Sequence, residues 1–571
     1  MTSVAGRSRF VIRSLHLLVA LPAVLLGAAC GEEPVEPSPG TGGTTLGSGA
    51  VGGALLAGNA GVGTGGVGAS GNGASSGVGG GASGTTGTAG GGGVDTGGST
   101  GAGGSAGTSG AAGEAGVGGA SGVGGAAGAP GGQAGDGGSS AGVGGSAGGG
   151  GDAGVGGDAG VGGSAGLGGT AGSSGAGGSG GAPGLDGYSK IYHVAPNGLS
   201  TNTGDSFDSP LDFTTALARV MGGQAILMQG GTYAIPYSEG QKNTIVLSKS
   251  GSESAPIGIF ANDGARAVID FGFPEQAWVQ DSFGFDLSGS YWYFYGIDIT
   301  RAGYQGVYVK GAHNTFRNVR FYDNRNSGLE INKGGSYTTV IDCDAYRNYD
   351  PKKLGSMADG FAPKQTQGPG NKFIGCRAWE NSDDGYDAFD SPEVVTFERC
   401  WAFRNGVDVW NYGGFTGNGN GFKVGGNAVV ARNVVTHSIA FDNPGKGFDQ
   451  NNNAGGVTLY NNTGYSNGTN FGFGNPVASG QMHVLKNNIS LDGAATIENA
   501  TQSHNSWLSG FSVSAGDFES LDVATATAPR NPDGSLPASP LFRLKASSAL
   551  NGAGVDVGLP FQGAAPNLGA F

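Results

Sequence analysis

The feature that most constrains the fold is an asparagine that returns at the end of successive short apolar runs. It stands at Asn324, Asn348, Asn381, Asn405, Asn443 and Asn467, in steps of 24, 33, 24, 38 and 24 residues. A second register, a glycine followed by an apolar residue, advances with it at Gly306-Val307, Gly328-Leu329, Gly360-Phe361, Gly385-Tyr386, Gly421-Phe422 and Gly447-Phe448. A basal step near 24 residues with occasional longer insertions is typical of a stacked solenoid.

The runs between the repeated positions favour strands over helices. Residues 338–341 and 394–397 are short and rich in β-branched or aromatic side chains, which suits a pleated sheet. Asparagines at one corner of successive coils can stack and satisfy backbone groups at the turn. Asn-Gly turns do not recur between every pair of runs, as hairpin architectures require. The sequence therefore predicts an all-β domain, a right-handed parallel β-helix, over residues 188–571.

Both ends of this domain carry their own patterns. Phe213, Leu217, Val220 and Met221 have the spacing of one helical face, so we expect a short N-terminal capping helix within residues 212–221 that covers the exposed sheet edge of the first coil. Residues 533–571 are predicted to be a loop-rich segment that closes the last coils.

The chain upstream of residue 188 has a different composition. The protein has 571 residues and 124 glycines, and most of the glycines lie in a Gly/Ala/Ser-rich stretch within residues 30–187. Such a stretch buries too little apolar surface to offset its ordering entropy, so we expect a disordered tether. A collagen-like rod is the alternative, but the strict Gly-X-Y period is missing.

Residues 1–29 have the pattern of an export signal. Arg7, Arg9 and Arg13 precede the apolar residues 15–26, and small residues follow up to Cys30. The pattern resembles a bacterial lipoprotein signal, which implies lipidation of Cys30 and an outer-membrane location with the C-terminal domain facing outward. The alternative is an ordinary secretory signal cut near Ala29, which would release the protein. The only membrane contact expected is through the N-terminal lipid anchor, where Cys30 is lipidated.

Three further cysteines share one repeated position. Cys343, Cys376 and Cys400 each stand five residues before a repeated asparagine, which predicts a buried ladder of thiols. The spacing of neighbouring strands, about 4.8 Å, leaves a disulfide open. Their spacing lacks the Cys-x-x-Cys pattern of zinc sites.

Four carboxylates converge on consecutive glycine-aromatic repeats. Asp359 stands before one aromatic residue, and Asp383, Asp384 and Asp387 surround the next. So many hard oxygen ligands in a small region suit Ca²⁺ better than zinc or copper. The alternative is that they are ordinary solvated turn residues.

A lysine follows the third aromatic residue of the same register. Ala362, Asp387 and Lys423 occupy matching positions in three repeats, so they are expected on one face of the helix, with Asp387 and Lys423 as neighbours. Lys423 is then either a base beside a metal site or a structural lysine paired with Asp387.

Residues 359–362, 381–387 and 419–423 are similar to the corresponding segments of polysaccharide lyase family 9, the pectate lyases and related lyases with a parallel β-helix. The similarity extends over most of residues 188–571, including 230–233 and 539–542. The resemblance implies that Asp359, Asp383, Asp384 and Asp387 bind a calcium ion and that Lys423 is the proton acceptor.

This resemblance implies a calcium-dependent pectate lyase that cleaves 4-linked galacturonan by β-elimination to unsaturated oligogalacturonides. Removal of the weakly acidic C5 proton requires stabilisation of the developing charge, which Ca²⁺ on the uronate carboxylate would supply. The ordinary pKa of a lysine is about 10.4. Burial and the cation must lower this pKa for the lysine to act as the base. An alkaline activity optimum is expected.

The net charge of −14 opposes binding of a polyanion and gives no reason to expect a nucleic-acid partner. Cations near the site must therefore make the local charge positive. Lys364 and Lys446 are candidate substrate contacts, unless they are solvated loop lysines. Trp410 and Tyr412 either stack on sugar rings or have a packing role. We expect a monomer that meets an acidic plant polysaccharide, pectate or pectin.

Three other functions stay open. A rhamnogalacturonan lyase of the same fold is the nearest, and a non-catalytic surface β-helix that binds glycans would need no base such as Lys423. A glycan hydrolase would use paired carboxylates as acid and base or nucleophile, which the acidic cluster can imitate. Only a lyase leaves an unsaturated uronate that absorbs ultraviolet light.

Overall fold

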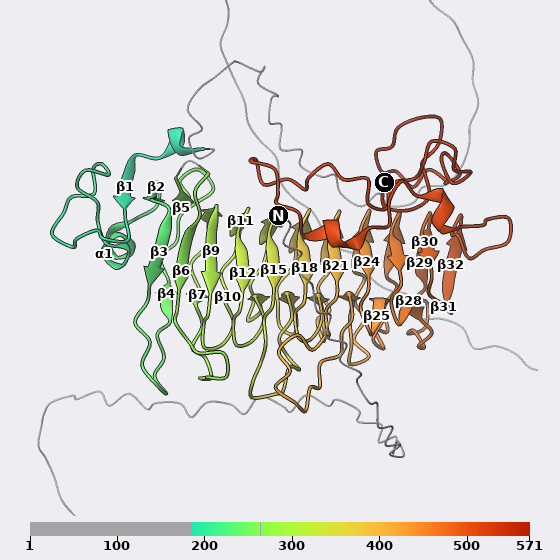
Figure 1. Cartoon of the computed structure of the whole chain (residues 1–571), viewed down its shortest axis with the longest axis horizontal. Helices are drawn as coiled ribbons and strands as arrows, with labels where there is room; N and C mark the ends of the chain where they lie inside the picture. Colours follow the sequence, from blue (N-terminus) through green and yellow to red (C-terminus); the bar gives the residue numbers. More distant parts are fainter. Residues whose placement is uncertain (1–183, 263) are drawn as a thin grey trace, which may run out of the picture. The chain divides into compact units, whose positions relative to one another are not determined.

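The computed structural model describes residues 184–262 and 264–571. Within them the chain winds through successive coils whose strands build three parallel sheets (Figure 1). This is the predicted all-β, right-handed parallel β-helix. The predicted signal peptide, Cys30 and nearly all of the predicted tether lie outside the described residues. The described part begins at Gly184, and the 3₁₀-helix η1 (Leu185–Gly187) packs Leu185 on Ala225, Leu227 and Phe260.

Sheet A has twelve strands. They are β1 (Lys190–Val194), β2 (Gln224–Met228), β5 (Ile257–Ala261), β8 (Trp292–Tyr295), β11 (Thr315–Arg317), β14 (Thr339–Ile341), β17 (Lys372–Ile374), β20 (Thr396–Glu398), β23 (Val434–Thr436), β26 (Thr458–Tyr460), β29 (His483–Lys486) and β32 (Ala500–Ser503).

Sheet B has ten strands. They are β3 (Gly231–Ala234), β6 (Ala267–Asp270), β9 (Ile297–Thr300), β12 (Arg320–Tyr322), β15 (Asp344–Tyr346), β18 (Arg377–Trp379), β21 (Trp401–Phe403), β24 (Ile439–Phe441), β27 (Thr463–Tyr465) and β30 (Ile489–Leu491).

Sheet C also has ten strands. They are β4 (Ile245–Leu247), β7 (Phe285–Leu287), β10 (Val307–Val309), β13 (Leu329–Ile331), β16 (Phe361–Pro363), β19 (Tyr386–Asp387), β22 (Phe422–Lys423), β25 (Lys446–Asp449), β28 (Thr469–Phe473) and β31 (Ala495–Ile497).

The glycine-aromatic register builds the core beneath sheet C. The aromatic rings point inward and stack from coil to coil, with centroids 4.6 Å apart for Tyr386 and Phe422 and 5.1 Å apart for Phe422 and Phe448. The preceding glycine is required by a close approach of backbones: a Cβ on Gly421 would lie 2.5 Å from the carbonyl oxygen of Gly447. The residue after each aromatic therefore faces outward.

The repeated asparagines stack from coil to coil, as predicted, and form a buried ladder. From Asn324 to Asn443, Nδ2 donates to Oδ1 of the repeated asparagine one coil on, as from Asn381 to Asn405 at 3.0 Å and from Asn405 to Asn443 at 3.1 Å. Their side-chain oxygens also accept from backbone amides, so the ladder satisfies polar groups that burial would otherwise leave unpaired.

The three cysteines are buried and free, which confirms the thiol ladder and excludes a disulfide among them in this structure. Burial raises the pKa of Cys376 and Cys400 well above the ordinary value. These thiols therefore stay protonated and have a packing role.

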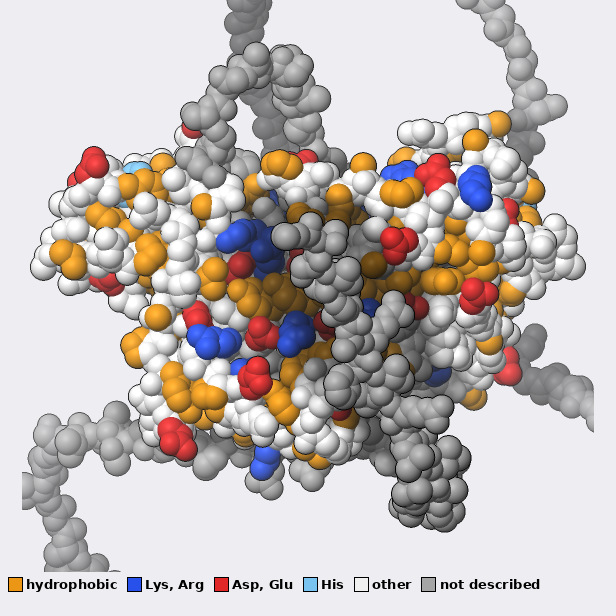
Figure 2. All heavy atoms as spheres, in the orientation of Figure 1, with side chains coloured by type: hydrophobic (Ala, Val, Ile, Leu, Met, Phe, Trp, Pro, Cys, Tyr) orange, Lys and Arg blue, Asp and Glu red, His pale blue; other side chains and the backbone are white. Residues whose placement is uncertain are grey.

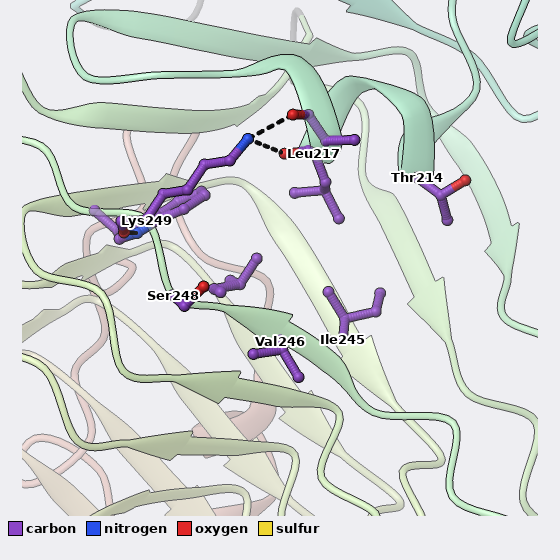
Figure 3. A pocket seen from close by; sticks show the side chains of 9 residues that line it. Thr214, Leu217, Ile245, Val246, Ser248 and Lys249 are labelled. Atoms are coloured by element: carbon purple, nitrogen blue, oxygen red, sulfur yellow. Dashed lines mark hydrogen bonds between the residues drawn. The ribbon is translucent and has the colours of Figure 1, made fainter. Parts of the chain in front are cut away.

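The capping helix is present but shorter than its apolar pattern. Helix α1 (Phe213–Arg219) begins with Asp212, whose side chain accepts from the Thr215 amide at 2.8 Å. The carbonyl oxygens at its C-terminal end accept hydrogen bonds from the Lys249 ammonium (Figure 3). A positive charge is a favourable partner for that end of a helix. Met221 lies beyond the helix and is 55% exposed, so its assignment to the apolar face was wrong.

The C-terminal segment does more than close the last coils. It includes the 3₁₀-helices η2 (Ala515–Asp517) and η3 (Val523–Thr527) and runs back along sheet B (Figure 1). Arg530 reaches Asp344 on β15, with Nη2 2.8 Å from Oδ1.

In the described part of the chain no helix is both long and apolar enough to cross a membrane.

Candidate functional site

The acidic residues and the lysine meet on three neighbouring strands of sheet C. Tyr386 pairs with Phe361 on one side and with Phe422 on the other. The same pairing sets Asp387 opposite Lys423. The two side chains are therefore neighbours on the outer face, as the register predicts.

Three of the predicted ligands form a compact buried group. Asp359, Asp384 and Asp387 each offer a carboxylate oxygen within 4.8 Å of the others. Asp384 Oδ1 accepts from the backbone amide and the side-chain amide of Asn420, at 2.8 and 2.9 Å. Asp384 Oδ2 is buried and accepts no hydrogen bond. A buried carboxylate oxygen without a donor is costly, and a cation in this group would remove that cost.

Asp383 has different surroundings. Its Oδ1 accepts from the amide of Asn418 and its Oδ2 from the amide of Met357, both at 2.7 Å. Asp383 thus ties two loops to the site and lies outside the compact group of three. Its role as a fourth ligand stays a prediction.

Two buried ammonium groups bracket the carboxylates. Lys423 Nζ lies 3.4 Å from both Asp384 Oδ2 and Asp387 Oδ1, and 4.9 Å from the centre of the Phe389 ring. Lys364 Nζ lies 3.1 Å from Asp359 Oδ2 and 3.4 Å from Asp387 Oδ2. With its side chain only 3% exposed, Lys364 is not the solvated loop lysine that the sequence left open. It bridges two predicted ligands.

Taken with Asp383, the compact group and its two lysines have a charge that one divalent cation would balance. Four aspartates carry four negative charges when ionised, and two lysines carry two positive charges. The excess of two negative charges is what one Ca²⁺ would neutralise, and oxygen ligands in this number suit that ion. The donor set therefore fits calcium.

The pKa values of the site reflect burial first and the neighbouring charges second. Burial raises the pKa of Asp383 to about 6, with Asp359 adding to the effect, and burial also raises the pKa of Asp359 and Asp384. Burial alone would lower the pKa of Lys423, but the four carboxylates outweigh it and raise that pKa well above its ordinary value. This direction is opposite to the one expected with calcium present, because a cation would offset the carboxylates.

The remaining predicted residues are a partly exposed lysine and two packed aromatic residues. Lys446 is 41% exposed in its side chain, and its Nζ donates to Asp449 Oδ1 at 2.7 Å. Trp410 and Tyr412 pack against Tyr349, with ring centroids 4.8 and 5.3 Å away, and the Tyr412 hydroxyl bonds Glu275. These contacts favour the packing role for both aromatics.

Several residues of the site escaped the sequence reasoning. Ser327 Oγ donates to Asp359 Oδ2 at 3.2 Å, Asn420 holds Asp384, and Phe389 underlies Lys423. They lie on loops, which have no periodic pattern to read. Only Asn420, within the quoted segment 419–423, stood next to a recognised signal.

The pocket between α1 and β4 is separate from this group. It is lined by residues of the first coils, including Thr214, Leu217, Ile245 and Lys249 (Figure 3), and by none of the clustered aspartates. On the face drawn in Figure 2, acidic and basic side chains are intermixed around a hollow with apolar side chains. The visible part of that face shows no continuous acidic patch.

Fold and site together define a parallel β-helix protein with a buried carboxylate and lysine group on one sheet. The family model described as "Pel9A-like, right handed beta helix region" matches residues 192–488. The chain belongs to this family, which confirms the resemblance inferred from the sequence.

Known relatives agree with this assignment. The chain is 59% identical over 383 residues to a protein of Dickeya dadantii named pectate lyase L, covering 67% of this chain and 90% of the relative. A pectate lyase L of Paenibacillus polymyxa is 34% identical over 392 residues, covering 64% of this chain and 84% of the relative.

Two solved structures share the fold. The crystal structure of pectate lyase Pel9A has a TM-score of 0.67 at 58% identity and covers 67% of this chain and 96% of its own. A rhamnogalacturonan lyase has a TM-score of 0.56 at 28% identity and covers 62% of this chain and 97% of its own.

Proposed function

We propose that this protein is a calcium-dependent pectate lyase that cleaves 4-linked galacturonan by β-elimination. The observation that carries the proposal is the juxtaposition of Lys423 with Asp384 and Asp387 on sheet C. The names of the relatives that are 59% and 34% identical support the choice of pectate as the substrate.

Asp359, Asp384 and Asp387 would hold the calcium ion, and Asp383 is proposed as a fourth ligand. A bound Ca²⁺ would supply a Lewis acid for the uronate carboxylate, which stabilises the charge that develops when C5 loses its proton. Asp384 Oδ2, which is buried and accepts no hydrogen bond, and the excess of two negative charges support this assignment.

Lys423 is proposed as the base. In its neutral form Nζ would take the C5 proton of the bound uronate. The electron pair of that C–H bond forms the C4–C5 double bond, and the C4–O bond breaks with its electron pair leaving on the oxygen of the departing sugar. Burial of Lys423 against Phe389 excludes water from the amine, which favours transfer to Nζ over transfer to solvent.

A rhamnogalacturonan lyase is the second candidate, because a solved enzyme of that name shares the fold at 28% identity. The higher identity to pectate lyases makes it the weaker choice. A hydrolase is the weaker choice because Asp384 and Asp387 are ion-paired with Lys423, whereas a hydrolase needs two carboxyl groups to act as acid and as base or nucleophile. A purely glycan-binding protein does not account for a buried lysine beside a cation site.

The product distinguishes these functions. The purified protein should be incubated with polygalacturonate and separately with rhamnogalacturonan, with calcium or with a chelator, while ultraviolet absorbance is followed. We expect absorbance to rise on polygalacturonate with calcium only. A rise on rhamnogalacturonan alone would favour the second candidate, and reducing sugar without absorbance would indicate a hydrolase.

We also propose that the protein is exported and either anchored by lipid on Cys30 in the outer membrane or released, and that it works as a monomer. The arginine leader, the apolar stretch and the small residues before Cys30 support export. Labelled fatty acid should enter the wild-type protein and not a Cys30→Ala variant. A soluble, unlabelled wild-type protein in the medium would favour the ordinary secretory signal.

A further inference from the structure

The outward row of sheet C continues past Lys423 toward the C-terminal end of the helix. Lys423 pairs with Asp449 on β25, and Asp449 pairs with Gly472 on β28. Neighbouring strands lie about 4.8 Å apart. The side chains of this row are therefore the first that a polymer lying along the helix axis would meet beyond the proposed base.

Lys446 lies along this stretch and has two close neighbours, Gly472 and Asp449. Its stem crosses Gly472, since a Cβ at that glycine would lie 2.4 Å from Lys446 Cδ and 3.0 Å from Cε. Its ammonium returns to Asp449 Oδ1 at 2.7 Å, and Asp449 Oδ1 is itself held by the Asn451 amide at 2.9 Å. Gly472 lies in a strand outside the left-handed region, so its backbone has no need for glycine. The missing side chain instead leaves room for the lysine stem.

The backbone of Lys446 is linked to the acidic group. Its amide donates to Asn420 Oδ1 at 2.9 Å, and the two nitrogens of Asn420 donate to Asp384 Oδ1. Asn420 therefore fixes the distance between the proposed metal site and this lysine. Preorganisation of this kind reduces the entropy lost when a ligand binds.

We propose that Lys446, positioned by Gly472 and Asp449, binds the carboxylate of a uronate that neighbours the cleaved sugar. This inference rests on the proposed function and identifies a subsite of it. An ammonium has three N–H donors, and the contact with Asp449 uses one of them. The 41% exposed side chain leaves the ammonium accessible to a second carboxylate. A 4-linked uronate chain presents one carboxylate per sugar, so consecutive carboxylates would meet the calcium site and then Lys446.

A double-mutant cycle tests the subsite. Lys446→Ala should raise KM for polygalacturonate about two- to fivefold with kcat nearly unchanged, the range of a partly exposed ion pair. Gly472→Ala should raise KM similarly, because the new methyl group displaces the flexible lysine stem. In the Lys446→Ala background Gly472→Ala should add nothing, since the displaced atoms are gone. Lys372→Ala, an exposed lysine on sheet A, is the matched control.

The outcomes separate the subsite from the proposed function. If the wild-type protein forms no unsaturated product on polygalacturonate, the proposed function is wrong. If the wild type is active and KM of Lys446→Ala equals that of Lys372→Ala, the subsite is wrong. If the effects of Gly472→Ala and Lys446→Ala on KM are additive, Gly472 does not position Lys446. Should Gly472→Ala fail to fold, Lys446→Ala alone decides the subsite.

Discussion

Lys423 is the residue whose protonation state governs the proposed chemistry. It can accept a proton only when neutral, and burial, which lowers its pKa, is outweighed by the carboxylates that raise it. Activity should therefore be lost as pH falls below this pKa and should rise toward alkaline pH. Calcium opposes the carboxylates, so the rise should move to lower pH as calcium is increased.

The profile of kcat against pH at two calcium concentrations checks this. An optimum below about pH 5, in the range where carboxylates titrate, would contradict a lysine base.

Asp384 is the residue on which calcium binding should depend most. Replacement by Asn removes one charge and changes the buried Oδ2 that accepts no hydrogen bond. Loss of an outer partner of a metal ligand typically costs about 10- to 100-fold in affinity, and loss of a ligand charge should cost at least as much. Calorimetric titration of Asp384→Asn with calcium measures it, and Asp556→Asn, at an exposed position, is the control. Unchanged affinity in Asp384→Asn would place the metal elsewhere.

Among the elements, the asparagine ladder stabilises the corners of the coils. Asn405 donates to Asn443 Oδ1 and accepts from the Asn381 side chain and amide. Asn405→Ala leaves these buried groups without partners, so unfolding free energy should fall by about 2–4 kcal/mol. Asn427 is exposed, so Asn427→Ala should lower the unfolding free energy much less. Equal losses in urea unfolding for both variants would show that the ladder is not a source of stability.

The C-terminal segment is held to sheet B by a buried ionic contact. Asp344 accepts from Arg377 and Arg530 at 2.8–2.9 Å, and Arg377 Nη1 also donates to Ala526 and Ala528 carbonyls. Asp344→Ala leaves buried arginines uncompensated, so we expect a loss of about 3 kcal/mol. Urea unfolding measures it, with the exposed Glu253→Ala as the control. A loss no larger than that of the control would contradict this role.

The same contact makes stability depend on pH. Burial alone would raise the pKa of Asp344, but Arg530 and Arg377 outweigh it and hold the pKa well below its usual range. Its contribution is therefore present above the unfolded-state pKa of about 3.9 and is lost as pH falls through the lower, folded-state pKa.

At the scale of the whole molecule, the parts that repeat could be predicted and the parts that do not repeat could not. The asparagine and glycine-aromatic registers predicted the coils, the outward direction of Asp387 and Lys423, and the thiol ladder, because backbone pairing repeats each position. Lys364 lies just after β16, where the chain leaves the sheet, so no register indicated that it is buried between Asp359 and Asp387. The return of the C-terminal segment along sheet B depends on contacts such as Arg530 with Asp344, which lie 186 residues apart in sequence.

The coils also explain why one sheet can hold the whole site. Parallel strands in register bring residues 359, 387 and 423 within two strand spacings, although long loops separate them in sequence. Those loops supply Asn420 and Phe389, which fix and cover the group.

The most direct test is the formation of unsaturated uronate by wild-type protein and by Lys423→Ala on polygalacturonate, with calcium and with chelator. Wild type should raise ultraviolet absorbance with calcium and not with chelator. Lys423→Ala should remain folded and bind calcium, yet be slower by about 10²–10⁴-fold, the usual contribution of a general base. A folded Lys423→Ala variant with full activity, or a wild type equally active in chelator, would contradict a calcium-assisted elimination at this site.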